Sequence, residues 1–133
     1  MFKFHHLGIV TSDLEQTTEF YNIMGYRKIA EAEDPIQKAQ IVLLESMAGE
    51  PLLELIRPID KDSPSHSWLT RIKAGPYHTC YETNSLNQAT AELELRGFKM
   101  VTELAPALIF DNRNIVFFWS SKVGLVELLE AKR

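Results

Sequence analysis

The stretch Lys3-Phe4-His5-His6-Leu7-Gly8-Ile9-Val10-Thr11 decides the fold, because its pattern returns 72 residues further along the chain. Over the 21 positions from His6 to Tyr26, six residues are identical at this offset, where chance gives about one or two. The agreement returns near the end of each half with a one-residue shift, where Leu52–Ile56 matches Leu125–Leu129. The chain is therefore an internal repeat. The six identical pairs are His6/His78, Thr11/Thr83, Leu14/Leu86, Gln16/Gln88, Thr18/Thr90 and Gly25/Gly97.

Each half is expected to contain four strands and one helix in the order β-α-β-β-β. Ser12 followed by Glu15 is a capping-box pattern, which predicts a helix that begins there and ends at Gly25. In the second half, Asn84 or Ser85 is expected to cap the matching helix. The predicted strands cover residues 3–11, 26–32, 39–45 and 51–57 in the first half, and 77–83, 98–103, 114–119 and 125–130 in the second.

The repeat divides the chain into two modules joined by a connector. Residues 1–58 are expected to form the first module, residues 59–74 the connector and residues 75–133 the second module, all within one compact domain. Ser63 and Pro64 predict the start of a short connector helix, because serine caps helices and proline suits the first helical position.

Composition and charge restrict the partners of this protein. Its 133 residues are 45% hydrophobic and 24% charged, as in a globular protein, and the formal net charge is −4 without a basic cluster. Nucleic acids and anionic membranes bind basic surfaces, so a small molecule is the expected partner instead. The single cysteine, Cys80, excludes an internal disulfide. No apolar run approaches the roughly 18 residues of a membrane span and no signal-peptide pattern is seen, so a cytoplasmic location is expected.

Two glutamates occupy positions that normally hold apolar residues. Glu54 lies in Leu-Leu-Glu-Leu-Ile and Glu127 in Leu-Val-Glu-Leu-Leu, where a carboxylate is costly unless it is paired or binds a cation. Each follows one repeated histidine, at separations of 48 (54 minus 6) and 49 (127 minus 78) residues. A pseudo-twofold repeat brings equivalent strands to one axis, so His6, Glu54, His78 and Glu127 are expected to meet. Two imidazoles and two carboxylates suit Ni, Co, Zn, Mn or Fe at an open site.

Other interpretations of these residues stay open. A single histidine on a strand is usually a core or edge residue, and either glutamate could point to solvent from an edge strand. His5 aligns with Tyr77 in the repeat, and strand alternation puts it on the face opposite to His6, so His6 is the predicted ligand. Cys80 is interpreted as ordinary core filling.

A family resemblance is carried by His6-Leu7-Gly8-Ile9-Val10, Asp13-Leu14, Phe20-Tyr21, Gly25-Tyr26, Glu54-Leu55, Pro76-Tyr77-His78 and Gly124-Leu125-Val126-Glu127-Leu128. These motifs span essentially the whole chain and resemble the vicinal oxygen chelate superfamily. The resemblance implies an α+β fold, in which two tandem βαβββ modules form an open, curved eight-stranded sheet around a metal ion, usually in a homodimer. The family's four ligand positions fall on His6, Glu54, His78 and Glu127.

Within that superfamily, the His/Glu/His/Glu set is similar to short bacterial, nickel-type glyoxalase I, as are segments 76–82, 111–113 and 124–130. This resemblance implies a lyase or isomerase that converts the hemithioacetal of methylglyoxal and a thiol into a lactoyl thioester. A divalent metal, Ni²⁺ or Co²⁺ first and Zn²⁺ next, then stabilises the enediolate. Glu127 is the expected base, with Glu54 as its partner in proton transfer.

Residues outside the four ligand positions add two further expectations. Asn112 and Arg113 are expected contacts of an anionic substrate, with a solvated turn as the alternative. Segment 54–58, running into Asp62-Ser63-Pro64 and Trp68-Leu69, is similar to methylmalonyl-CoA epimerase.

Two features separate the chain from the epimerases it resembles. Epimerases carry a second catalytic glutamate on the strand predicted at 39–45, where this chain has Gln40, and Glu45 lies further along the strand. They also carry a glycine-rich loop, whereas residues 106–114 contain no glycine. The glyoxalase I type is therefore the main expectation, and an acyl-CoA epimerase is the alternative. A non-catalytic drug- or ligand-binding module is the second alternative.

Overall fold

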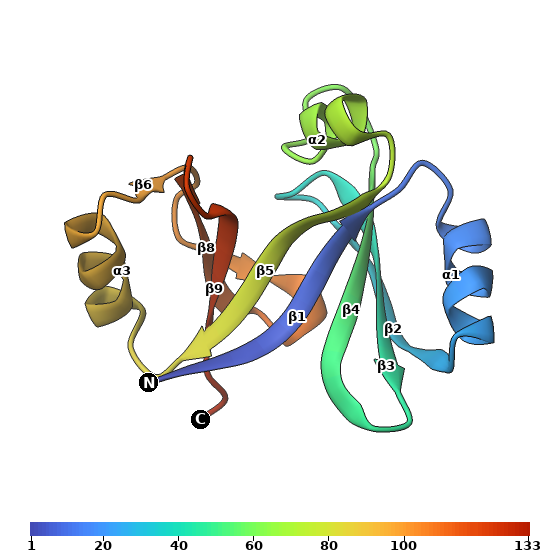
Figure 1. Ribbon diagram of the computed structural model, residues 1–133, viewed down its shortest axis with the longest axis horizontal. Coiled ribbons are helices and arrows are strands. Elements are labelled where there is room, and N and C mark those ends of the chain that lie inside the picture. The colour runs from blue at the N-terminus through green and yellow to red at the C-terminus, as the bar shows by residue number, and fades with distance from the viewer.

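All strands of the protein belong to one sheet, which carries helices at its margins (Figure 1). The computed structural model describes residues 1–133 without a gap. The strands are β1 (Phe2–Val10), β2 (Tyr26–Asp34), β3 (Ala39–Ser46), β4 (Gly49–Pro58), β5 (Gly75–Thr83), β6 (Lys99–Met100), β7 (Ala105–Ala107), β8 (Arg113–Ser120) and β9 (Gly124–Glu130). The helices are α1 (Leu14–Ile23), α2 (His66–Ile72) and α3 (Leu86–Leu95), with a 3-10 turn η1 at Leu108–Phe110.

The sheet is built from two similar halves that meet at its centre. Its strand order is β2-β3-β4-β1-β5-β9-β8-β6, with β7 paired to β8. β1 is parallel to β4 just as β5 is parallel to β9, and β1 pairs antiparallel with β5 between the halves. The predicted α+β fold of paired βαβββ modules is confirmed. The sheet has nine strands rather than eight, because β7 forms within residues 104–113, where a loop was expected.

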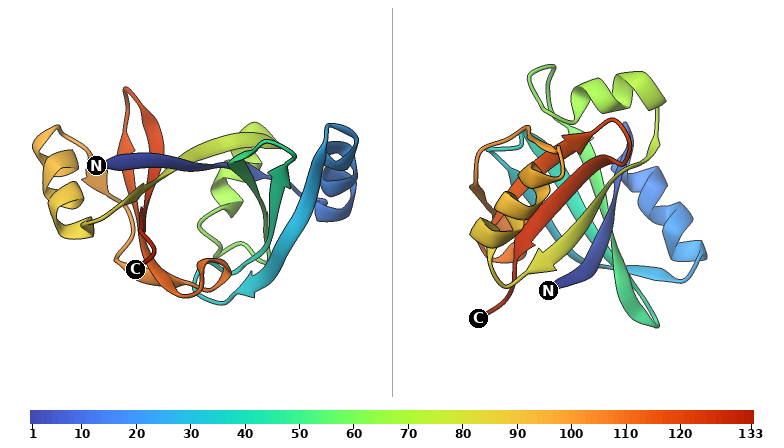
Figure 2. Two further views of the ribbon diagram at one scale, coloured as in Figure 1. Left: turned by 90° about the horizontal axis from the view of Figure 1, so that it is seen from below. Right: turned by 60° about the vertical axis from the view of Figure 1, so that its left-hand side comes forward.

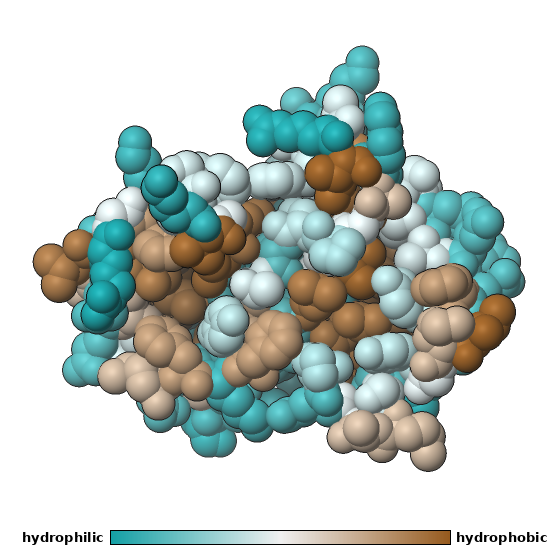
Figure 3. Space-filling model, viewed as in Figure 1, coloured by the Kyte–Doolittle hydropathy of each residue, from teal (hydrophilic) through white to brown (hydrophobic).

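The sheet curves into a U, with α1 and α3 on its outer side (Figure 2). On the first half, Leu14 and Tyr21 of α1 pack against the buried side chains of β3 and β4. On the second half, Leu86 and Ala89 of α3 pack against Phe118 of β8 and its neighbours. Apolar side chains gather beside both helices on the face that Figure 3 presents. The helices therefore cover the convex face and leave the concave face to a different cluster.

The concave face holds its own apolar cluster, which surrounds the centre of the U. Leu43 from the first half packs there with Cys80, Phe110, Phe117 and Leu129 from the second half. This cluster joins the two modules across the cleft. Burial of aromatic and aliphatic side chains from both halves stabilises their association, in addition to the β1–β5 strand pairing.

The caps of α1 and α2 lie one and two residues later than predicted, whereas the cap of α3 is one of the two expected residues. Asp13, rather than Ser12, caps α1: its Oδ1 accepts a hydrogen bond from the Gln16 amide at 3.0 Å. Ser85 caps α3 as one of the two expected residues, with its Oγ accepting from the Gln88 amide at 3.2 Å. The connector helix starts after Ser65 rather than Ser63, whose hydroxyl instead donates to the Lys38 carbonyl.

The expected strand at residues 98–103 is shorter in the structure, where β6 contains Lys99 and Met100 alone. The chain then leaves β8, and the Thr102 hydroxyl accepts a hydrogen bond from the Phe117 amide at 2.9 Å. A side chain thus replaces a backbone partner at this edge of the sheet. None of the helices has the length and apolar character that crossing a bilayer requires.

Candidate metal centre

The central strands β4, β1, β5 and β9 bring four polar side chains together. In the strand register, His6 is paired with Cys80 and Cys80 with Glu127, while Gly8 is paired with both Glu54 and His78. Two neighbouring rows of residues therefore cross the four strands. The pseudo-twofold relation between the halves exchanges His6 with His78, and Glu54 with Glu127. Strand pairing alone places these residues next to one another, and all four come from one chain.

The four side chains converge on one point. His6 Nε2 lies 3.2 Å from His78 Nε2, 3.3 Å from Glu54 Oε1 and 3.1 Å from Glu127 Oε1. His78 Nε2 lies 3.5 Å from Glu54 Oε1 and 3.1 Å from Glu127 Oε1. All four potential ligand atoms are within 4.8 Å of one another. For metal–ligand bonds of about 2.0–2.1 Å, neighbouring ligands in a tetrahedron are about 3.3 Å apart, so the set has the dimensions of a coordination shell.

The chemistry of this group also fits a cation. His6, Glu54, His78 and Glu127 are each at most 3% exposed. Glu54 Oε2, Glu127 Oε1 and His78 Nδ1 are buried without a hydrogen-bond partner. Buried polar atoms are normally paired, and buried carboxylates are paired or bind metals. A divalent cation would compensate both carboxylates at once, so the four residues form a group that could hold a metal ion.

Mutual electrostatics dominate the site when no cation is present. Burial opposes ionisation of His6, but Glu54 and the other facing groups outweigh it and raise the pKa of this imidazole well above its usual range. The pKa of His78 is likewise raised against burial by Glu127 and Glu54. Burial would raise the pKa of both carboxyls, yet the imidazoles hold the pKa of Glu54 and of Glu127 below its usual range. The metal-free centre is therefore stabilised by protonated imidazoles between ionised carboxylates.

The ring of His78 is held by packing. A Cβ at Gly8 would lie 2.0 Å from His78 Cε1, so only glycine leaves room for this ring. Tyr77 contacts it edge-on, with ring centroids 4.6 Å apart, and Phe117 does so at 5.2 Å. Gly8 was placed in the strand by sequence pattern alone. Its contact with the His78 ring depends on the strand register, which cannot be deduced from the sequence pattern.

His5 lies beside His6, contrary to the prediction that strand alternation puts it on the opposite face. The β1–β5 register shifts between Phe4 and His6, so His5 is the extra residue of a β-bulge. The bulge turns both imidazoles to the same side, and their Nδ1 atoms are 2.8 Å apart. Burial and then the positive charge of His6 lower the pKa of His5 to about 4.

Cys80 lies fully buried in the concave cluster, next to the four polar residues. Burial and then the carboxylate of Glu127 raise the pKa of its thiol. The thiol is thus kept protonated, in line with the interpretation of Cys80 as a core residue. It also belongs to a second group of potential metal ligands, together with His5 and His6.

Arg113 and Asn112, the expected substrate contacts, do not line the pocket described below. Arg113 Nη1 is 2.8 Å from Glu82 Oε2 and donates to the Glu130 carbonyl at 3.1 Å. Asn112 is exposed in a left-handed turn, with φ of 62°. The guanidinium already has protein partners, and a substrate role for either residue stays a prediction.

Gln40, at the position expected for an epimerase glutamate, accepts a hydrogen bond from Arg57 Nε at 3.0 Å. Ala39 and Ile41, the residues on either side of it, belong to a buried cluster that contacts Tyr77. Successive strand residues face opposite sides of the sheet, so Ala39 and Ile41 face Tyr77 and the Gln40 side chain lies on the other face. The carboxylates of the centre itself are then Glu54 and Glu127, and the neighbouring pocket has Glu103 in its lining.

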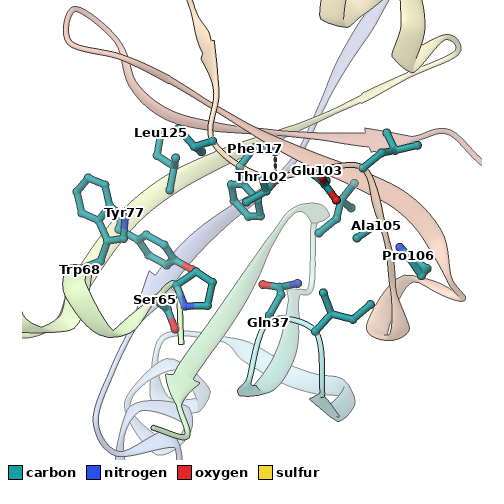
Figure 4. A pocket seen from close by; sticks show the side chains of 15 residues that line it. Gln37, Ser65, Trp68, Tyr77, Thr102, Glu103, Ala105, Pro106, Phe117 and Leu125 are labelled. Atoms are coloured by element: carbon teal, nitrogen blue, oxygen red, sulfur yellow. Dashed lines mark hydrogen bonds between the residues drawn. The ribbon is translucent and has the colours of Figure 1, made fainter. Parts of the chain in front are cut away.

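A pocket of about 450 Å³ opens next to the centre, and sequence patterns did not reveal it. Tyr77, Phe117 and Leu125 form one wall, Trp68 and Ser65 lie at the connector, and the segment before β7 closes the other side (Figure 4). None of the four polar residues lines this pocket, but Tyr77 and Phe117 line it and contact the His78 ring, so the pocket lies one side chain away from the centre. Its volume is typical of small-molecule sites, and its lining is mostly apolar.

Comparisons with known proteins agree with this geometry. Residues 5–117 match the family model described as the glyoxalase/bleomycin resistance protein/dioxygenase superfamily. The chain is 28% identical to the mitochondrial methylmalonyl-CoA epimerase of Bos taurus over 97% of its length and 74% of the relative. It is 30% identical to that of Homo sapiens over 76% of its length and 57% of the relative. The methylmalonyl-CoA epimerase of Mycobacterium tuberculosis has the same fold, with a TM-score of 0.86, 23% identity, and coverage of 98% and 88% of the two chains.

The expected glyoxalase I-type lyase is wrong, because three of the curated relatives are named methylmalonyl-CoA epimerases. The family model that matches the chain is described by several classes of protein, so membership of that superfamily does not by itself identify the enzyme class. The motifs that distinguished them were segment 54–58 and Trp68-Leu69, which were similar to the epimerases. The chain is therefore similar to enzymes, and its relatives support the alternative reading.

Proposed function

Because the chain belongs to the glyoxalase/bleomycin resistance protein/dioxygenase superfamily, we propose that it is a metal-dependent epimerase of acyl-CoA thioesters. Methylmalonyl-CoA is the first substrate to test, since the curated relatives are named for it. Inverting a carbon atom next to a thioester requires removal of a proton from one face and delivery of a proton to the other. Two carboxylates related by the pseudo-twofold axis suit this need, and this observation carries the proposal.

In this proposal, His6, Glu54, His78 and Glu127 hold a divalent cation, with Co²⁺, Ni²⁺ and Zn²⁺ as the ions to compare. The cation would supply Lewis-acid stabilisation of negative charge on the thioester oxygen. Ionised Glu127 takes the α-proton from one face, and Glu54, which must carry a proton at the start of the turnover, delivers that proton to the other face, so Glu127 ends protonated and Glu54 ionised. The apolar pocket lined by Tyr77 and Phe117 excludes water from the reacting carbon. One chain supplies all four residues, so a homodimer, which stays a prediction, is not needed to complete the centre.

The test follows exchange and inversion separately in the Co²⁺-loaded protein. In D₂O, the wild type should convert one enantiomer of methylmalonyl-CoA into both and introduce deuterium at the α-carbon. Removing either carboxylate as a base, in Glu54→Gln or Glu127→Gln, should slow inversion by about 10²–10⁴-fold. Each variant should still exchange the α-proton of one enantiomer, and the two variants should differ in which one.

Glu45→Gln is the matched control, because Glu45 lies on β3 and pairs with Arg27 at 2.6 Å, outside the centre. This variant should invert the substrate at the wild-type rate. Absence of both exchange and inversion in the loaded wild type would refute the epimerase proposal. Wild-type rates in both Glu54→Gln and Glu127→Gln would refute the assignment of the two bases.

A further inference from the structure

His5 is adjacent to a proposed metal ligand, yet it takes no part in the four-residue group. It occupies the bulge of β1, and its Nδ1 lies 2.8 Å from Nδ1 of His6, the ordinary length of a hydrogen bond. A regular strand would have sent its side chain to the other face. The bulge therefore has a specific result, which is to bring a second imidazole against the outer nitrogen of His6.

The state of His6 Nε2, which faces the other three residues of the group, determines whether Nδ1 of the same ring carries a proton. His6 Nε2 is the atom that faces Glu54, Glu127 and His78. A cation bound at Nε2 requires that nitrogen to be free of a proton, so Nδ1 carries the proton and donates it. The acceptor within reach is Nδ1 of His5. We propose that His5 is a positioning residue, which fixes the tautomer and the ring orientation of His6 for metal binding; this rests on the proposed metal function.

Phe110 holds both imidazoles of this pair in place. Its ring contacts His5 edge-on, with centroids 5.1 Å apart at 88°, and stacks on His6 at 5.3 Å and 23°. Phe110 is 4% exposed and belongs to the concave cluster. His5, the proposed acceptor, is thus packed against a buried aromatic ring, and such packing helps it to orient the His6 ring.

His78, the second histidine of the four-residue group, has no such support. His78 Nδ1 is buried without a hydrogen-bond partner, and the residue equivalent to His5 is Tyr77, which contacts His78 through its ring edge. Support through a hydrogen bond is therefore particular to His6. The group His5, His6 and Cys80 could alternatively be a separate metal site. The 2.8 Å between the two Nδ1 atoms is shorter than the about 3.3 Å between ligands that share a tetrahedral metal.

Co²⁺ affinity in a matched pair of variants tests this role. His5→Phe keeps a ring against Phe110 but removes the acceptor, whereas His5→Asn places an oxygen near the position of Nδ1. Loss of an outer hydrogen-bond partner weakens metal binding by about 10–100-fold, so His5→Phe should bind Co²⁺ that much less tightly than the wild type. His5→Asn should recover most of the affinity. His66→Phe, which changes a histidine on α2, should bind as the wild type does.

The outcomes separate this inference from the proposed function. A wild type that binds no Co²⁺ overturns both. Wild-type affinity in His5→Phe, or equal loss in His5→Phe and His5→Asn, overturns the positioning role alone. A second measurement needs no variant: long-range ¹H–¹⁵N NMR of the Zn²⁺-loaded wild type should show the His6 proton on Nδ1. A proton on Nε2 of His6, or metal coordination by the Cys80 thiolate, overturns the inference.

Discussion

The two halves of the sheet place the same pair of side chains but support them differently. In the first half, Nδ1 of His6 is within hydrogen-bond distance of Nδ1 of His5, at 2.8 Å, and His6 lies beside Cys80 of β5. In the second half, His78 packs on Gly8, the residue equivalent to Cys80, and its Nδ1 has no hydrogen-bond partner. Placement of the proposed ligands thus follows from strand register, which the repeat preserves. Ligand support follows from individual side chains, which have diverged.

The largest expected effect comes from replacing Gly8 by alanine, compared with the same replacement at the equivalent position, Cys80. Gly8→Ala would place a Cβ 2.0 Å from His78 Cε1, so the ring must move. Displacing a ligand should weaken Co²⁺ binding by at least about 100-fold, and overpacking should cost about 1–3 kcal/mol of unfolding free energy. Co²⁺ titration and urea unfolding measure the two effects.

Cys80→Ala is the control at the equivalent position of the other half. It removes a buried thiol without moving a ligand, so Co²⁺ affinity should stay close to that of the wild type. The comparison between the halves fails if Gly8→Ala binds Co²⁺ normally. It also fails if the two variants lose affinity equally.

A second prediction concerns the pH at which both halves bind metal. The raised pKa of His6 and of His78 stabilises the metal-free fold below the ordinary imidazole pKa of about 6.5, and this stability is lost as pH rises through the raised values. The lowered pKa of Glu54 and of Glu127 adds stability that is lost only in acid, as pH falls below about 4.3. Metal binding needs both imidazoles unprotonated.

The increase in Tm on adding Co²⁺ should therefore grow between pH 6 and pH 8, measured against samples with a chelator. His6→Asn and His78→Asn should each weaken this pH dependence, because each half contributes one imidazole. A Co²⁺-induced shift in Tm that is constant or shrinks as pH rises would contradict the coupling of metal binding to proton release.

A third prediction uses an ion pair that only the second half carries. Arg113 and Glu82 are paired at 2.8 Å with side chains 12% and 18% exposed, and the residue equivalent to Glu82 in the first half is Val10. Arg113→Met leaves the carboxylate without its partner and should cost about 1–3 kcal/mol of unfolding free energy. The double variant Glu82→Val, Arg113→Met should recover much of that loss.

Steady-state kinetics distinguish this structural role from the predicted substrate contact. Arg113→Met should leave KM for the acyl-CoA substrate unchanged once the protein is folded. A raised KM with unchanged stability would instead assign Arg113 to substrate binding.

The smallest effect is expected at the residue equivalent to His5. Tyr77 and His78 form a perpendicular ring pair with centroids 4.6 Å apart at 89°, so we expect ring packing rather than the hydroxyl to support His78. Tyr77→Phe should therefore keep Co²⁺ affinity within about twofold of the wild type, unlike His5→Phe. A tenfold loss in Tyr77→Phe would show that both halves use a polar group to support their histidine.

The sequence was sufficient to bring the four polar residues together, because a repeat with a histidine early and a glutamate late in each half allows few arrangements. It could not reveal the bulge at His5, because one extra residue in a strand leaves the local pattern of apolar residues unchanged. The cap of α1 moved from Ser12 to Asp13 for a similar reason, since both residues can cap and only backbone geometry selects one.

The enzyme class was mispredicted because it was inferred from the four polar residues, whereas a substrate is also selected by the pocket beside them. That pocket combines Trp68 of the connector with Phe117 and the segment before β7. These parts are distant in sequence, and Trp68 belongs to the connector, which has no counterpart in the repeat. Periodicity and pairing therefore predict the symmetric centre, whereas the asymmetric surroundings require the folded structure.

The most direct test of the account is the stoichiometry of Co²⁺ binding to metal-free protein, followed by visible absorption and by molecular mass in solution. One Co²⁺ per chain is expected, in monomer or dimer alike, because His6, Glu54, His78 and Glu127 all belong to one chain. Glu54→Ala and Glu127→Ala should each weaken binding to a similar degree, as equivalent residues of the two halves. No bound Co²⁺, or one ion for every two chains, would contradict a centre formed by the two modules of a single chain.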